Sequence, residues 1–150
     1  MNLKPIGHIE TPFATLADCP RNGRQLDPAP ECVAVVAPEY QPGLASLDGF
    51  SHLILLYWLG PQGGALTIRP PFDGMERGVF ATRAPLRPNP IGLSVVAFAG
   101  FAGPGRLRVR YLDCRTGTSL LDIKPYLPST DAERDATMGW LAPHRTPGPA

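Results

Sequence analysis

Gly78-Val-Phe-Ala-Thr-Arg-Ala-Pro-Leu-Arg-Pro-Asn-Pro-Ile-Gly-Leu-Ser94 divides the chain, because an apolar, strand-like run breaks here into a proline-rich loop and then resumes. The prolines fix their own φ angles, donate no backbone N–H and push the residues before them into extended conformations. The loop therefore carries Arg83, Arg87 and Asn89 on a stiff backbone, which suits binding of an anionic or planar polar ligand. The alternative is a stiff surface connection whose arginines are solvated.

The apolar runs on both sides of this loop are short and are separated by glycine and proline. Residues 50–59 are continuously apolar, and we expect them to form a core strand buried on both faces. The pattern predicts an all-β fold, an antiparallel barrel or sandwich with long Pro/Gly-rich loops. Alternating or β-branched runs predict further strands over residues 4–10, 32–36, 92–98, 106–112 and 120–126.

One short C-terminal helix is expected in addition to the strands. Thr130 and Glu133 have the spacing of a capping box, which predicts a helix over residues 131–140. The chain of 150 residues suits a single domain. We place this β domain at residues 1–142 and a flexible tail at residues 143–150.

Composition excludes several classes of protein. The formal net charge of +1 lacks the basic excess of most nucleic-acid binders, so any such binding needs a local patch. Cys19, Cys32 and Cys114 are widely spaced, which predicts neither a disulfide framework nor a zinc site and suits a reducing cytosol. The apolar run at residues 53–59 is too short to span a bilayer. We therefore expect a soluble, cytoplasmic protein that binds no membrane and no metal.

Arginines outside the central loop form two groups. Asn22-Gly23 favours a turn between Arg21 and Arg24, which either bind a ligand or are solvated. In the strand predicted over residues 106–112, alternation places every second side chain on one face. That face is either a solvated outer surface or a basic stripe, and it carries Arg106, Arg108 and Arg110.

Candidate acid–base groups lie in two predicted strands. Asp122 and Lys124 share one face and could pair with each other. His52 begins the core strand, where a histidine is either a hydrogen-bonded core residue or an acid–base group. The sequence contains no Walker loop, strand-borne GxGxxG, HExxH or GxSxG, so phosphate-loop, Rossmann, zincin and hydrolase-elbow classes lack their motifs.

Longer motifs connect the chain to a known family. They are Pro5-Ile-Gly-His-Ile-Glu-Thr-Pro-Phe13, Gly49-Phe-Ser-His-Leu53, Gly78-Val-Phe-Ala-Thr-Arg83 with Arg87-Pro-Asn-Pro-Ile-Gly-Leu93, and Leu121-Asp-Ile-Lys-Pro-Tyr126. In these motifs and their order the chain resembles the TsaA-like (TrmO) family over nearly its whole length. The resemblance implies a dimeric β-barrel methyltransferase that uses S-adenosylmethionine. Its implied substrate is the exocyclic nitrogen of threonylcarbamoyl-adenosine beside the tRNA anticodon.

By position, the resemblance also implies a set of cofactor contacts in several loops. Gly60 stands where the family commonly has histidine, and Thr116-Gly-Thr-Ser119 stands where it has Asp-Gly-Thr-Pro. Compared with longer members of the family, we also expect this protein to lack their C-terminal domain. Methylation of a small metabolite and cofactor binding without catalysis therefore remain alternatives. The implied contacts are Pro20, Arg21, Asn22, Gly60, Pro61, Arg83, Leu93, Thr116, Gly117, Thr118 and Ser119.

Charge assigns provisional roles around such a cofactor. Its sulfonium is cationic, so Arg21, Arg83 and Arg87 suit the methionyl carboxylate or substrate phosphates. Leu93 can pack on the adenine ring, and the backbone of residues 116–119 can hydrogen-bond the adenine edge or the ribose. The expected substrate-binding residues are Arg87, Asn89 and Lys124.

The sequence also leads to expectations about the catalytic residues and the oligomeric state. Methyl transfer depends mainly on holding the nucleophile in line, and Asp122 and His52 are the candidates if a base is needed. A small barrel filled by its own side chains leaves the site at the surface. A second copy can complete such a site, so we expect a homodimer with its interface beside residues 83–93.

Overall fold

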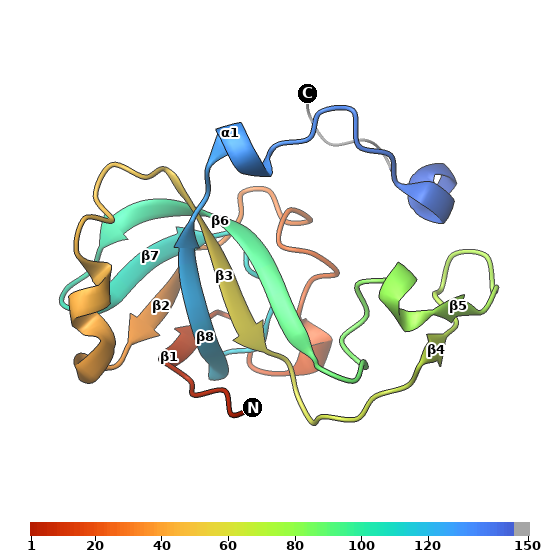
Figure 1. The fold of residues 1–150 in the computed structure, drawn as a ribbon, viewed down its shortest axis with the longest axis horizontal. Helices are drawn as coiled ribbons and strands as arrows, with labels where there is room; N and C mark the ends of the chain where they lie inside the picture. The colour runs from red at the N-terminus through yellow and green to blue at the C-terminus, as the bar shows by residue number, and fades with distance from the viewer. Residues whose placement is uncertain (146–150) are drawn as a thin grey trace.

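The computed structural model describes residues 1–145 and contains a closed antiparallel barrel in the strand order β1-β2-β7-β6-β3-β8 (Figure 1). Strand β8 pairs with β1 on one edge and with β3 on the other, which leaves no open edge in the barrel. The predicted all-β antiparallel barrel is thereby confirmed. The barrel strands are β1 (Gly7–Glu10), β2 (Cys32–Val36), β3 (His52–Trp58), β6 (Ile91–Phe101), β7 (Arg106–Arg110) and β8 (Thr118–Pro125).

The barrel interior is filled by side chains that alternate along the strands. On β3, Leu53, Leu55 and Tyr57 are buried, whereas the residues between them are half-buried. The expectation that this strand is buried on both faces is therefore wrong, because only one face points into the barrel. With a filled interior, the barrel leaves no room for a ligand inside it. Other core residues include Ile9, Ala34, Val36, Val96, Leu107, Val109 and Leu120.

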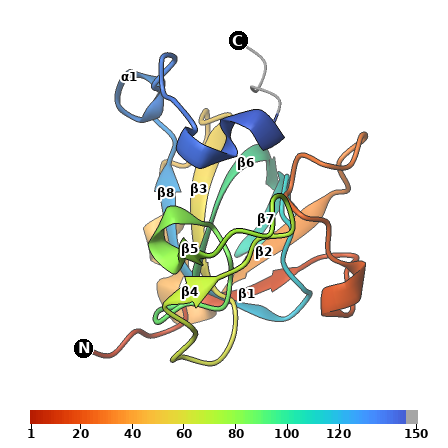
Figure 2. The same ribbon diagram turned by 90° about the vertical axis from the view of Figure 1, so that its right-hand side faces the viewer.

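An arm projects from the barrel between β3 and β6 (Figures 1 and 2). It consists of β4 (Thr67–Ile68) and β5 (Arg77–Gly78), which pair antiparallel with each other. The strand-like run that follows is a 3-10 helix, Val79–Ala81, so the extended conformation expected there is wrong. The reason lies at its end, where both the backbone N–H and the hydroxyl of Thr82 donate to the Val79 carbonyl and close the turn.

The C-terminal segment has less helix than predicted. Helix α1 (Pro128–Asp131) is one turn long, and a 3-10 helix (Gly139–His144) follows after an irregular stretch. The helix predicted over residues 131–140 is therefore wrong. Neither short helix buries a residue fully, and an isolated helix without a buried apolar face is not stable in water. The predicted flexible tail lies largely outside the described residues, since only its positions up to 145 are described.

On the outer face of the barrel, glutamate side chains neutralise most of the positive charge of the β7 arginines. Arg106 forms an ion pair of 2.7 Å with Glu10, and this hydrogen-bonded guanidinium lowers the pKa of the Glu10 carboxyl. Arg108 and Arg110 lie 3.4 and 3.9 Å from the Glu31 carboxylate. The predicted alternation is confirmed, and its outward arginines are paired with carboxylates.

The remaining short helices and the cysteines complete the framework. Two 3-10 helices, Leu16–Asp18 and Pro38–Leu44, lie in the loops on either side of β2. Burial raises the pKa of the Cys32 thiol to about 11 and that of Cys114 to about 12, so both remain protonated core residues. Within residues 1–145, no helix has the length and apolar character needed to cross a membrane. The same part of the chain holds no cluster of three or more potential metal ligands.

The close approach of β1 and β2 at Gly7 gives the first prediction. A Cβ at this position would clash with the Val35 carbonyl. We expect Gly7→Ala to lower the free energy of unfolding by about 1–3 kcal/mol, as overpacked sites do. The matched control is Gly43→Ala, which has open space around it. Urea unfolding checks the pair, and equal stabilities would contradict the barrel register.

Candidate functional site

A pocket of about 660 Å³ opens at the barrel rim, and we call it the rim pocket. It lies where β3 and β6 meet three irregular segments. These are the proline-rich loop at residues 82–90, which we call the proline loop, the loop after Pro20 and the segment that follows β7. Its lining therefore combines strand ends with irregular loops. The lining residues are Arg21, Asn22, Gly23, Arg24, Tyr57, Leu59, Thr82, Arg83, Ala84, Arg87, Asn89, Ile91, Gly92, Leu93, Ser94, Val95, Tyr111, Asp113 and Arg145.

A chain of hydrogen bonds lies among these residues where the pocket meets the barrel core. The Tyr57 hydroxyl is 2.7 Å from the Ser94 hydroxyl and donates to Asp113 Oδ1 over 3.1 Å. Burial, and after it the charge of Asp113, raises the pKa of Tyr57, so this hydroxyl keeps its proton. Gly92 lies against the Tyr57 ring, and a Cβ there would clash with it. The ring is thus held in one position.

The loop after Pro20 is fixed to the barrel by a close backbone approach. A Cβ on Gly23 would clash with the Tyr111 carbonyl, so the loop can pack this tightly only with glycine. The Arg24 guanidinium lies 3.8 Å from the centre of the Tyr111 ring, a cation–π contact. Tyr111 itself has a left-handed φ of 80°, unusual for a residue with a side chain. This wall of the pocket is therefore ordered without regular secondary structure.

The proline loop forms the opposite wall and is held by its own arginines. Arg87 donates to the carbonyls of Thr82 and Ala84 at 3.0 and 3.3 Å. Arg83 donates to the Leu93 carbonyl at 3.0 Å and keeps further N–H donors for a ligand. The rigidity expected from the prolines is thus supplemented by guanidinium contacts within the loop.

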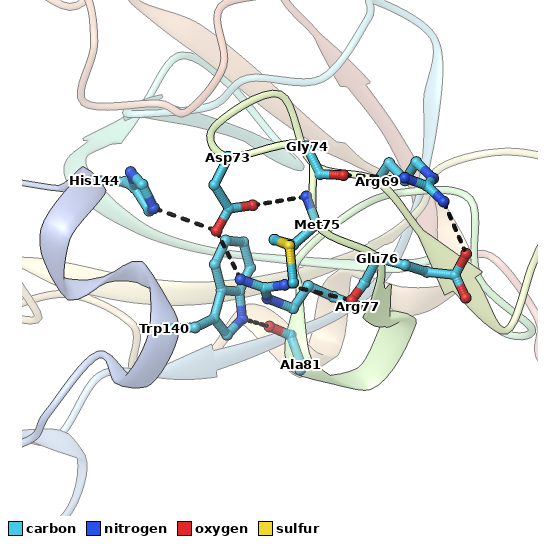
Figure 3. A network of polar contacts seen from close by, with 9 residues as sticks. All are labelled: Arg69, Asp73, Gly74, Met75, Glu76, Arg77, Ala81, Trp140 and His144. Carbon is cyan, nitrogen blue, oxygen red and sulfur yellow. Dashed lines mark hydrogen bonds and ion pairs between the residues drawn. The ribbon is translucent and has the colours of Figure 1, made fainter.

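The C-terminal segment, residues 139–145, packs on the arm through Trp140 and His144, and we call it the strap (Figure 3). Its last residue, Arg145, lines the rim pocket. Trp140 Nε1 donates to the Ala81 carbonyl at 2.8 Å. Ala81 directly precedes Thr82, the first residue of the proline loop that lines the pocket. The Arg77 guanidinium lies 4.7 Å from the centre of the Trp140 ring. The strap is therefore attached both to the arm and to the start of the proline loop.

A charged cluster reinforces this attachment (Figure 3). Asp73 lies 2.7 Å from Arg77 and 3.6 Å from His144, and the His144 ring stacks on Phe72 with centroids 5.5 Å apart. The hydrogen bond from the backbone N–H of Met75, followed by the charge of Arg77, lowers the pKa of Asp73 below its ordinary 3.8. Asp73 therefore stays charged at neutral pH, and its contribution is lost only as the pH falls through that lowered value.

The rim pocket brings together part of the site predicted from sequence. Thr118 and Ser119 begin β8, so only the first half of the expected 116–119 turn is a turn. Ser119 lines a second pocket of about 460 Å³, and Asn89 lines both. Predicted residues in the rim pocket are Arg21, Asn22, Arg83, Arg87, Asn89 and Leu93. Those outside its lining are Pro20, Gly60, Pro61, Thr116, Gly117, Thr118, Ser119, His52, Asp122 and Lys124.

The two candidate bases have other contacts. Asp122 lies 2.8 Å from Lys124, the pairing that their shared face predicted, and this hydrogen bond raises the pKa of Lys124. The His52 Nδ1 is 2.8 Å from the Ser51 hydroxyl, and its ring meets Tyr126 edge-on. Neither residue lines the rim pocket, so neither is well placed to act on a ligand bound there.

Sequence reasoning missed the polar residues nearest the barrel core. Tyr57 and Ser94 were hidden because each lies in an apolar strand, and Asp113 because it lies in the irregular segment after β7, where no motif marked it. A signal did exist, since a tyrosine in a buried strand needs a partner for its hydroxyl. The identity of that hydrogen-bond partner depends on strand pairing, which the sequence does not reveal.

The fold and the rim pocket define a closed β-barrel protein with an arginine-rich ligand site built from loops. Residues 8–132 match the model of the tRNA-methyltransferase O N-terminal domain. The chain is 44% identical over 132 residues to an S-adenosyl-L-methionine-binding protein of Archaeoglobus fulgidus, covering 87% of this chain and 93% of the relative. The chain belongs to the TrmO N-terminal domain family, as its motifs predicted.

Two further relatives from Pseudomonas aeruginosa extend the comparison. A putative S-adenosylmethionine-dependent methyltransferase, RcsF, is 40% identical over 145 residues, which are 92% of this chain and 62% of the relative. The crystal structure of TrmO from that organism superposes with a TM-score of 0.74 at 36% identity, covering 93% of this chain and 62% of the crystallised one. The chain thus spans about 62% of that protein. These names confirm S-adenosylmethionine as the cofactor of the family.

The strap gives the second prediction. Trp140→Ala removes the bond to the Ala81 carbonyl and the ring between Phe72 and Arg77, so we expect trypsin to cleave after Arg134 and Arg145 about tenfold faster. The barrel itself should melt at nearly the wild-type temperature. Trp140→Phe, which keeps a ring but loses the N–H donor, should give an intermediate rate. Unchanged cleavage in both variants would contradict the attachment.

Proposed function

We propose that this protein is an S-adenosylmethionine-dependent methyltransferase of tRNA, acting on the exocyclic nitrogen of threonylcarbamoyl-adenosine beside the anticodon. The observation that carries the proposal is the rim pocket. It gathers Arg21, Asn22, Arg83 and Leu93, four residues at which the family resemblance implies cofactor contacts. Their convergence from separate loops supports a cofactor site at this rim.

The lining suits the parts of such a cofactor. Leu59, Ile91 and Leu93 supply apolar surface for an adenine ring, and the arginines suit the methionyl carboxylate. When bound, S-adenosylmethionine supplies an electrophilic methyl group on a positively charged sulfur. The protein's contribution is then to orient the nucleophile and to exclude water, which favours an in-line displacement.

The tRNA part of the proposal rests on charge around the rim pocket. The arginines of β7 are paired with Glu10 and Glu31, whereas Arg21 and Arg145 have no carboxylate partner within residues 1–145. Guanidinium groups at the rim favour contacts with phosphates or splayed bases of an RNA loop.

A homodimer belongs to the same proposal. Phe80 and Leu86 are 76% and 62% exposed beside the pocket loops, and Ile91 and Leu93 are also exposed. Exposed large apolar side chains favour a protein partner, and a twofold interface beside residues 83–93 would cover those on this loop.

The alternatives are methylation of a small metabolite and cofactor binding without catalysis. Gly60, Thr116 and Ser119 depart from the family pattern, and the relative from Archaeoglobus fulgidus is named only as a binding protein. Both alternatives keep the cofactor site. In the first, the methyl acceptor is a small metabolite, and in the second there is no methyl acceptor.

The decisive experiment concerns tRNA. We expect purified protein with S-adenosylmethionine to add one methyl group to threonylcarbamoyl-adenosine in tRNA prepared from cells that lack this protein. Mass spectrometry of the digested nucleosides measures the product. Cofactor binding without any methylated nucleoside would contradict the tRNA proposal and favour an alternative.

Cofactor binding gives a second test. Arg83 lines the rim pocket, whereas Arg106 is paired with Glu10 on the barrel exterior. We expect Arg83→Ala to weaken S-adenosylmethionine binding roughly tenfold or more, as loss of a charged hydrogen bond does, and Arg106→Ala to leave it unchanged. Isothermal titration calorimetry measures both. Equal losses would move the cofactor away from this pocket.

Assembly can be measured independently. We expect light scattering to give about twice the chain mass of 16.1 kDa. Leu86→Glu, which places a charge on the exposed apolar surface, should shift the protein toward the monomer. A wild-type monomer with full cofactor binding would contradict an interface that completes the site.

A further inference from the structure

Asp113 is the only carboxylate lining the rim pocket among residues 1–145, where five arginines also line it. In the same part of the chain, no lysine or arginine nitrogen lies within 4.0 Å of the Asp113 carboxylate. Other carboxylates do have cationic partners; these are Glu10, Glu31, Asp73, Glu76 and Asp122. A carboxylate among arginines offers a partner for a cationic group, so its presence favours a ligand that carries a cation as well as an anion.

The position of Asp113 is fixed by its neighbours. An ionised carboxylate only accepts hydrogen bonds, so the Tyr57 hydroxyl donates to Asp113 and the Ser94 hydroxyl donates to Tyr57. Leu112 and Cys114 on either side of Asp113 are buried. Tyr111, with its left-handed φ of 80°, lies just before this segment. Backbone strain of this kind is stored most often at functional sites.

We propose that Asp113 binds the ammonium group of the methionyl part of S-adenosylmethionine, while arginines of the same pocket bind its carboxylate. The inference rests on the proposed cofactor function and adds a residue that neither the motifs nor the family comparison assigns. An amino-acid zwitterion needs one anionic and one cationic partner close together. The rim pocket offers this combination, with Arg83 still holding N–H donors beyond its bond to the Leu93 carbonyl.

The ammonium group fits Asp113 better than the sulfonium does. Tyr57 occupies one lone pair on Oδ1, so Oδ2 and the remaining lone pairs can accept N–H donors. An ammonium has three such donors, and a charge-assisted hydrogen bond is both short and strong. A sulfonium has no N–H donor and would use only the charge of Asp113. The two choices predict different effects on ligands that differ at sulfur.

Three ligands separate these possibilities by isothermal titration calorimetry. S-adenosylmethionine and S-adenosylhomocysteine both carry the ammonium, but only the first carries the sulfonium charge. 5′-Methylthioadenosine carries neither. We expect Asp113→Asn to weaken binding of the first two by the same factor, roughly tenfold to a hundredfold, and to leave 5′-methylthioadenosine binding unchanged.

Two further variants complete the experiment. Tyr57→Phe removes the hydroxyl that orients Asp113 but keeps the ring, so it should cause a smaller and equally matched loss for the two amino-acid ligands. If Asp113→Asn does not fold, binding of the same three ligands is compared in Tyr57→Phe instead. The control is Asp48→Asn, an exposed carboxylate in the turn before β3, which should change none of the three affinities.

Each contrary result overturns the proposal in a recognisable way. A loss for S-adenosylmethionine alone would assign Asp113 to the sulfonium. An equal loss for 5′-methylthioadenosine would make Asp113 a structural residue of the pocket. Unchanged binding of all three would remove Asp113 from the site and leave the proposed cofactor function standing. A wild-type protein that binds none of the three would overturn the cofactor function itself.

Discussion

The pairing of β8 with both β1 and β3 is the constraint on which the rest of the structure depends. This strand closes the barrel, and closure gives every barrel strand two hydrogen-bonded neighbours. It also sets the direction of the side chains, because alternate residues on each strand must fill the interior. The register of β3 and β8 shifts between Leu56 and Tyr57, near the end where the rim pocket opens.

A filled interior forces the ligand site onto the rim, where regular strands give way to loops. These loops are nevertheless well anchored. Gly23 packs on the Tyr111 backbone, Gly64 packs on the backbone at Arg87, and Trp140 joins the strap to the start of the proline loop. Because each anchor joins segments far apart in sequence, the pocket walls depend on the completed barrel and cannot form from the loops alone.

Charge divides the surface into two parts with different properties. On the outer face of β7, the arginines are balanced by Glu10 and Glu31. At the rim, five arginines surround a single lining carboxylate, Asp113, among the described residues. The rim therefore carries an excess of positive charge, which suits ligands that present carboxylate or phosphate oxygens.

The sequence by itself determined the all-β class, most of the strands and the stiff loop that carries Arg83, because alternation and proline act on neighbouring residues. Its motifs also predicted the family and the cofactor, which the family match and the named relatives confirm. It failed for the helix predicted over 131–140, since nothing local showed that this segment lacks a surface to pack on. Only the tertiary structure decided the partners of Tyr57, because Ser94 reaches it through strand register and Asp113 through the path of the chain after β7, and both depend on contacts between distant parts of the chain.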